Sequence, residues 1–197
     1  MGTLYDTKVM IRLIVLLGNK GLQYATTRHN AGWLFLAERY NSFSPGNWQE
    51  KFHGMWTKGL YAQTPLLLLK PMTFMNDSGR SVAAIARYFS VETEDILIVH
   101  DDIELPFRTV RLQKGGPLAG HNGLRSITSA LGSNQLHRLR IGIGRPLHGT
   151  VSSYVLGRFD EFEQAEIPLV FDRAEKMLFT WFLQGCRAEE LPITQKI

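Results

Sequence analysis

The strongest constraint on the fold is a repeated pattern in which a short apolar run is followed by a segment with helical spacing. A run rich in Ile, Leu and Val covers residues 11–17 and ends at Gly18, and similar runs lie at 66–69, 96–99 and 139–143. Apolar runs of this length are typical of strands buried on both faces. Helical spacing follows at 30–40, 78–89, 124–131 and 161–184. The pattern predicts a three-layer α/β/α domain with a twisted, mixed and mostly parallel central sheet.

Length and composition favour one domain. The chain has 197 residues, of which 44% are hydrophobic and 20% are charged, as is ordinary for a globular domain of about 100 to 200 residues. We expect a single domain over residues 1–197, because no internal repeat or linker interrupts the pattern. The only cysteine, Cys186, excludes an intramolecular disulfide and a Cys-rich zinc site, which favours a reducing compartment.

The first apolar run is too short for a secretion signal or a membrane span. Its uninterrupted part, residues 13–17, compares with about 7 to 15 residues for a signal-peptide core and about 20 for a transmembrane helix. We therefore expect a soluble, cytoplasmic protein that does not enter a membrane.

Basic residues are unevenly distributed along the chain. The 22 Lys and Arg residues exceed the 18 Asp and Glu residues by four. Residues 105–150 contain no acidic side chain and seven basic ones, which are Arg108, Arg111, Lys114, Arg125, Arg138, Arg140 and Arg145. One interpretation is a solvated face whose acidic partners come from elsewhere in the fold. The other is a surface that binds phosphates, since guanidinium groups match phosphate oxygens bidentately.

Five polar residues follow the predicted strands or lie near the predicted helix starts. They are Asn19, His29, Asn76, Asp101 and Asn122. Ligands of α/β domains bind beyond the carboxyl ends of the strands, so we expect these residues on loops at one end of the sheet. A His that titrates near neutral pH, a carboxylate that orients it, and amides that hold an oxyanion or a water suit the attack of water on an acyl ester.

Helix capping is the alternative role for several of these polar residues. Asn76, Asp77 and Ser78 could cap the helix that follows them, and Thr27 could cap the first helix.

The motifs of other reaction classes are absent from the sequence. The sequence contains no His-x-x-x-His pair, no Gly-x-Ser-x-Gly, no Gly-x-Gly-x-x-Gly and no P-loop, so we expect neither a metal nor a cofactor.

Six segments in order carry a specific resemblance to a known family. They are residues 17–32, 70–79, 100–106, 120–124, 137–146 and 154–159, and they include Thr-Arg-His-Asn-Ala-Gly, Lys-Pro-Met-Thr-Phe-Met-Asn and Gly-His-Asn-Gly-Leu. In these segments the chain resembles the bacterial peptidyl-tRNA hydrolases. Each motif alone is weak, but together they span some 140 residues.

The resemblance implies hydrolysis of the ester between a peptide, or an N-blocked aminoacyl group, and the 3′ end of tRNA, by a metal-independent monomer. It implies that His29 is the catalytic base, that Asp101 orients it, and that Asn19, Asn76 and Asn122 hold the substrate and the attacking water. Further positions that match the family's substrate pocket are Tyr24, Asn30, Phe74, Met75 and His121.

The resemblance also implies that two basic residues clamp the 5′-phosphate of the acceptor stem. Arg140 matches one of them, but the other aligns with Gln113. Lys114 would replace it only if the strand ends or bulges there, because neighbouring residues of a strand point to opposite faces. Arg111 is the second candidate. We expect Arg140 with Lys114.

The chain departs from the family in two loops. Leu16 and Lys20 replace a Gly and a Pro beside Asn19, and residues 117–119 are bulkier than the family's glycines.

Two rival functions remain. A non-catalytic RNA-binding protein, such as a splicing factor of the same fold, would not need the catalytic set, and an esterase for small esters would not need the acid-free basic segment.

Overall fold

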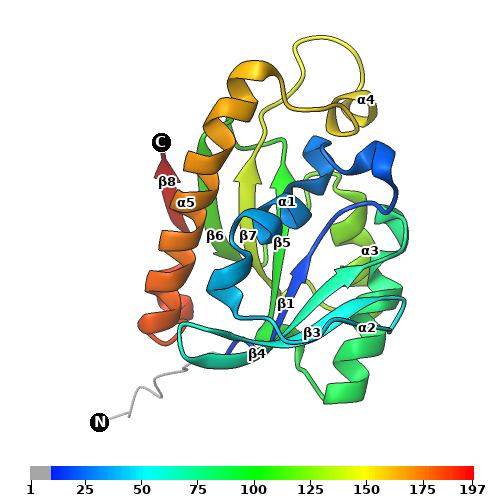
Figure 1. Ribbon diagram of the computed structural model, residues 1–197, viewed down its shortest axis with the longest axis vertical. Coiled ribbons are helices and arrows are strands. Elements are labelled where there is room, and N and C mark those ends of the chain that lie inside the picture. The colour runs from blue at the N-terminus through cyan, green and yellow to red at the C-terminus, as the bar shows by residue number, and fades with distance from the viewer. Residues whose placement is uncertain (1–9) are drawn as a thin grey trace.

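The structure, a computed structural model, describes residues 10–197. Strands and helices alternate along most of the chain (Figure 1). The strands are β1 (Leu13–Leu16), β2 (Gln49–Lys51), β3 (Gly54–Tyr61), β4 (Thr64–Pro71), β5 (Ile96–Asp102), β6 (Thr109–Lys114), β7 (His137–Gly142) and β8 (Ile193–Lys196). The α-helices are α1 (Ala31–Glu38), α2 (Ser78–Phe89), α3 (Asn122–Leu131), α4 (Val151–Val155) and α5 (Glu161–Leu183). Short 3₁₀ turns precede α1 at Arg28–Asn30 and α2 at Met75–Asp77.

One mixed sheet runs through the molecule in the order β2-β3-β4-β1-β5-β7-β6-β8. The four strands β4, β1, β5 and β7 are parallel neighbours. The strands β3 and β6 run antiparallel to them, and β2 and β8 turn back into the common direction at the two edges. The predicted three-layer α/β fold with a mostly parallel sheet is confirmed.

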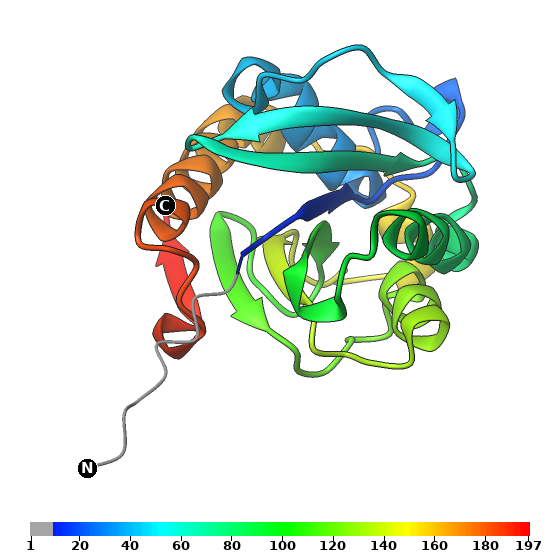
Figure 2. The same ribbon diagram turned by 90° about the horizontal axis from the view of Figure 1, so that it is seen from below.

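The core lies on both faces of the sheet because successive strand residues point to opposite sides. On one face, Ile14 and Leu16 of β1 belong to the apolar cluster that α1 and α5 cover. On the other, Leu13 and Val15 pack in the cluster beneath α2 and α3. Figure 2 shows the helices distributed around the two sides of the sheet. Every residue of β1 and β5 is buried, as the apolar runs predict.

A glycine places α1 directly against the strand ends. A Cβ atom on Gly32 would lie 2.6 Å from the Val99 carbonyl oxygen and 2.7 Å from the Leu17 backbone nitrogen. Real Cβ atoms do not approach backbone so closely, so a glycine is required at this position. The close packing brings the turn before α1, which contains His29, next to the end of β5.

Several local expectations are wrong. The strand β5 continues through Asp102, so Asp101 lies at the end of a strand and not on the following loop. Neither Thr27 nor Asp77 caps a helix with its side chain, and the Ser78 hydroxyl donates to the Met75 carbonyl instead.

No helix within residues 10–197 is long and apolar enough to cross a membrane.

Candidate active site

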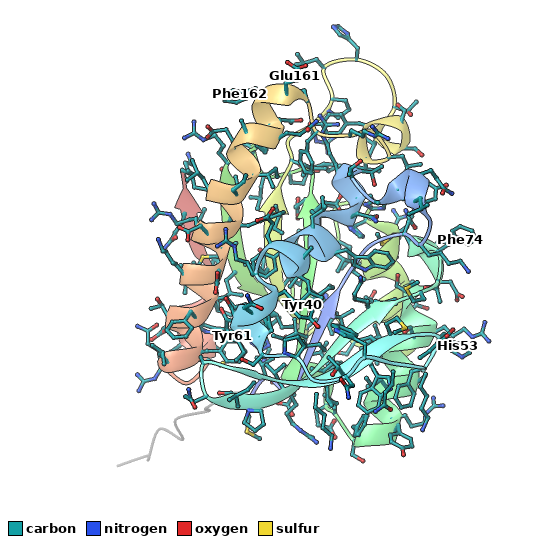
Figure 3. The ribbon with its side chains drawn as sticks, viewed as in Figure 1. Tyr40, His53, Tyr61, Phe74, Glu161 and Phe162 are labelled. Carbon is teal, nitrogen blue, oxygen red and sulfur yellow. The ribbon has the colours of Figure 1, made fainter. Side chains whose placement is uncertain are left out.

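A cavity of about 450 Å³ opens at the end of the sheet toward which the central strands point. Its walls come from the loop after β1, the turn before α2, the end of β5, the start of α3 and the helix α4. The predicted site residues that line it are Asn19, Tyr24, His29, Phe74, Met75, Asn76, Asp101, His121 and Asn122. Phe74 is exposed and projects from the edge of the molecule (Figure 3).

His29 and Asp101 form a buried pair on the cavity wall. The Nδ1 atom of His29 lies 2.9 Å from Oδ1 of Asp101 and 3.1 Å from Oδ2. An ionised carboxylate only accepts hydrogen bonds, so Nδ1 of His29 carries the proton and donates. The free electron pair of the neutral ring is then on Nε2, which can accept a proton from a water molecule.

The two partners shift each other's pKa. Burial by itself lowers the pKa of His29, but the charge and the hydrogen bond of Asp101 outweigh it and raise that pKa above its ordinary value. Burial by itself raises the pKa of Asp101, but His29 and His121 outweigh it and hold that pKa well below its usual range. Asp101 is therefore charged throughout the neutral range, and its charge makes His29 a stronger base than an isolated imidazole.

His121 connects this pair to α3. Its Nε2 atom lies 3.2 Å from Oδ1 of Asp101. Its Nδ1 atom accepts hydrogen bonds from the backbone nitrogens of Gly123 and Leu124 and thus caps α3. Because Nδ1 must accept, the proton of the neutral ring is on Nε2, which donates to Asp101. Asp101 therefore accepts from two histidines.

Asn19 ties two walls of the cavity together. Its Oδ1 accepts from the backbone nitrogen of Met75 at 2.9 Å. Asn30 is fully buried behind it, accepts from the Asn19 backbone nitrogen at 2.8 Å and donates to the Asn19 carbonyl at 3.1 Å. Asn30 does not line the cavity. It supports the loop that carries Asn19.

Asn76 and Asn122 present unengaged amides to the cavity. Both are exposed and line it. Among residues 10–197, neither side chain makes a hydrogen bond, and the cap of α3 is His121 rather than Asn122. Neither amide caps a helix, so the capping alternative is wrong for Asn76, and each amide keeps two donors and an acceptor for a substrate.

Within residues 10–197, one cluster of three side chains could offer ligands to a metal, and both of its histidines are already hydrogen-bonded to its aspartate. One ligand atom each of His29, Asp101 and His121 lies within 4.8 Å of the other two. The proton-carrying nitrogens of both rings point at Asp101, so a cation there would have to displace both hydrogen bonds. The donor set suits proton transfer better than metal binding.

One wall was missed from the sequence. Val151, Ser152 and Val155 of α4, with Leu156 just after it, line the cavity, and α4 lies over the ends of the central strands (Figure 1). The segment 154–159 is one of the motifs noted above, but α4 has only five residues, which is too short for helical spacing to be recognised in the sequence.

The basic segment is largely paired with acids from elsewhere. Its ion pairs are Arg108 with Glu166, Lys114 with Glu94, Arg140 with Asp102 and Arg145 with Glu104. Arg140 is buried and also donates to Gln113 at 2.6 Å. In the register of β6 and β7, Arg111 lies opposite Arg140 and Lys114 lies opposite His137. These four residues thus have the acidic partners that the solvated-face interpretation expects, although Arg140 itself is buried and not solvated.

A buried His-Asp pair beside free amides, at the carboxyl end of an α/β sheet, is an arrangement that suits a hydrolase in which a general base activates water. A family model described as peptidyl-tRNA hydrolase matches residues 13–195. A peptidyl-tRNA hydrolase of Geotalea uraniireducens is 43% identical over 175 residues, which are 89% of this chain and 92% of that protein. One of Mycolicibacterium vanbaalenii is 45% identical over 166 residues, 82% of this chain and 85% of that one.

Solved structures agree with these relatives. The crystal structure of the Acinetobacter baumannii peptidyl-tRNA hydrolase superposes with a TM-score of 0.82 at 38% identity, over 89% of this chain and 90% of that one. The chain belongs to the peptidyl-tRNA hydrolase family. The family and the enzyme class predicted from the motifs are thereby confirmed.

Proposed function

We propose that this enzyme hydrolyses the ester that joins a peptide, or an N-blocked aminoacyl group, to the 3′ end of tRNA, and so recycles tRNA from stalled translation. The observation that carries the mechanism is the hydrogen-bonded His29-Asp101 pair in a cavity that also contains unengaged amides. A non-catalytic RNA-binding role is not favoured, because the complete set of reactive groups is assembled in one place.

In the proposed reaction, Nε2 of His29 accepts a proton from a water molecule as its oxygen attacks the ester carbonyl carbon. The bond to the ribose 3′ oxygen then breaks, and the imidazolium returns the proton to that oxygen. Asp101 keeps the ring in the required tautomer and stabilises its positive charge. The side-chain NH₂ groups of Asn76 and Asn122 donate to the peptide carbonyls or to the oxyanion, a role in which one donor contributes about 10²- to 10³-fold in rate. No metal or cofactor takes part.

The acceptor stem and the 3′ CCA end are the proposed binding determinants, with Arg140 in a clamp for the 5′-phosphate. The strand register favours Arg111 as its companion, because residues directly opposite each other in a sheet lie on the same face. Lys114 stays the alternative prediction, although its ammonium group lies 2.6 Å from Glu94. We expect a monomer that works in the reducing cytoplasm.

The decisive assay follows release of an N-acetyl-aminoacyl group from full-length tRNA, with and without a chelator. The proposal requires hydrolysis that the chelator leaves unchanged. A protein that cleaves a short peptidyl-adenosine ester equally well would instead be an esterase for small esters.

The clamp is tested in Arg140→Ala, Arg111→Ala and Lys114→Ala by the slope of log affinity for tRNA against log salt. Each lost phosphate contact should flatten the slope by somewhat less than about one unit. If only Arg140→Ala changes the slope or the preference for a 5′-phosphate, neither candidate companion belongs to the clamp.

A further inference from the structure

The cations without acidic partners lie mainly outside the clamp. Within residues 10–197, none of Lys51, Arg80, Arg87 and Arg125 takes part in an ion pair, and all four are exposed. They belong to the end of β2, to α2 and to α3. A solvated cation without an acidic partner is available to an incoming anion. An anion that binds Arg140 must instead compete with Asp102 for its guanidinium group.

The elements that carry these four cations touch one another. The helices α2 and α3 touch where the Gly79 backbone nitrogen donates to Ser126 Oγ at 2.9 Å, and a Cβ on Gly79 would meet the Ser126 carbonyl oxygen. Arg80 and Arg125 each lie one residue from this contact. We call Lys51, Arg80, Arg87, Tyr88 and Arg125 together the α2 surface.

At the far end of the α2 surface, an aromatic contact joins the end of β2 to α2. The ammonium nitrogen of Lys51 lies 4.1 Å from the centre of the Tyr88 ring, and the Phe52 ring packs 5.1 Å from Tyr88. Tyr88 is nevertheless 61% exposed. Its ring holds the turn between β2 and β3 against α2, while its hydroxyl is available to solvent.

The α2 surface leads away from the cavity. Asn76, on the cavity wall, lies two residues before the start of α2, and Arg80 follows in its first turn. Arg80 and Arg87 are seven residues apart, which places them on the same side of the helix and about 10 Å apart. In Figure 3, His53 of the adjoining turn and Phe74 of the cavity mouth project from the same edge of the molecule. A ligand that extends out of the cavity can therefore follow α2.

Acidic residues interrupt this surface little. Glu50 precedes Lys51 in β2, and alternation along a strand directs it to the opposite face. Asp77 lies at the start of α2, and the helix itself contains no acidic residue.

We propose that the α2 surface binds the sugar-phosphate backbone of the tRNA acceptor arm, as a second contact beyond the 5′-phosphate clamp. The inference rests on the proposed function. Arg80, Arg87, Arg125 and Lys51 contact phosphates, and the Tyr88 hydroxyl donates to a phosphate or a ribose 2′-hydroxyl. The surface positions the arm and reads no base sequence.

The test compares Arg80→Ala/Arg87→Ala with Arg80→Lys/Arg87→Lys. Binding of uncharged full-length tRNA is measured across a salt series, and cleavage is measured on peptidyl-tRNA and on a short peptidyl-adenosine ester. We expect the alanine pair to flatten the salt slope by about one to two units. It should raise KM for peptidyl-tRNA severalfold and leave kcat/KM for the short ester within about twofold of the parent. The lysine pair should keep most of the salt slope.

The control is Arg173→Ala/Lys176→Ala, which removes the same charge from exposed positions of α5 on the opposite face of the sheet. An unchanged slope in the Arg80/Arg87 alanine pair, or an equal loss in the α5 pair, overturns the proposal. A parent protein that fails to cleave peptidyl-tRNA would refute the proposed function. A parent that cleaves it and binds tRNA independently of Arg80 and Arg87 would refute the α2 surface alone.

Discussion

His121 donates from Nε2 to Asp101 Oδ1 at 3.2 Å while its Nδ1 caps α3, so a single ring links the Asp101 carboxylate to the helix that begins at Asn122. The two roles need opposite properties from the two nitrogens. A hydrogen on Nδ1 would remove the acceptor that the backbone of α3 requires. The fold thus favours the tautomer that carries its hydrogen on Nε2.

The cap can be separated from the contact with Asp101. His121→Asn keeps a side-chain acceptor for the helix, whereas His121→Ala removes it, and loss of such a cap costs about 1 kcal/mol. We expect the free energy of unfolding, measured in urea, to fall by about that amount more in the Ala variant. Equal losses in the two variants would show that the cap contributes nothing.

Asp101→Asn should lower the rate and move the acidic limb of the pH profile. The charge of Asp101 raises the pKa of His29, so its removal lowers that pKa and leaves the base unprotonated at more acidic pH. The acidic limb of kcat/KM therefore shifts to lower pH. A limb that stays in place, or moves to higher pH, would separate Asp101 from the titration of His29.

Asn76→Asp and Asn122→Asp should keep the thermal stability of the parent and lose most of the activity. Neither amide caps a helix, and the change replaces an NH₂ donor with acceptors only. Loss of one donor to the oxyanion costs about 10²- to 10³-fold in kcat. The measurement pairs calorimetry with peptidyl-tRNA kinetics. A variant that melts and cleaves like the parent has no catalytic amide at that position.

Stability should fall as the pH drops below about 6.5, the ordinary pKa of histidine. Burial, with Lys114 nearby, lowers the pKa of His137 in the folded protein to about 4. Between these values the unfolded chain binds a proton that the folded protein does not, at a cost of about 1.4 kcal/mol per pH unit. In His137→Gln the slope of unfolding free energy against pH should decrease by up to about 1.4 kcal/mol per pH unit, which corresponds to the loss of one bound proton. An unchanged slope would show that His137 is not buried as a neutral ring.

The site was predictable where chemistry follows an apolar run, because parallel strands bring their carboxyl ends together. Asn19 and Asp101 line one cavity for this reason, and His29 joins them because Gly32 lets α1 pack against the strand ends. Whether Asn122 caps α3 or keeps a free amide was not predictable, because it depends on His121 capping that helix with its side chain.

Long-range charge pairing was also beyond the sequence. The basic segment pairs with four acids that lie outside it in the chain and meet their partners only in the folded protein, namely Glu94, Asp102, Glu104 and Glu166. Short edge strands such as β2 and β8, with three and four residues, carry too little alternation to be recognised.

The central claim is that His29 is the general base, and His29→Ala tests it most directly. The measurement is single-turnover hydrolysis of N-acetyl-aminoacyl-tRNA with saturating enzyme, beside the affinity of the same variant for uncharged tRNA. General base catalysis is worth about 10²- to 10⁴-fold, so the rate should fall within that range while tRNA binding changes little. A rate within a few fold of the parent, with tRNA binding intact, would contradict the account.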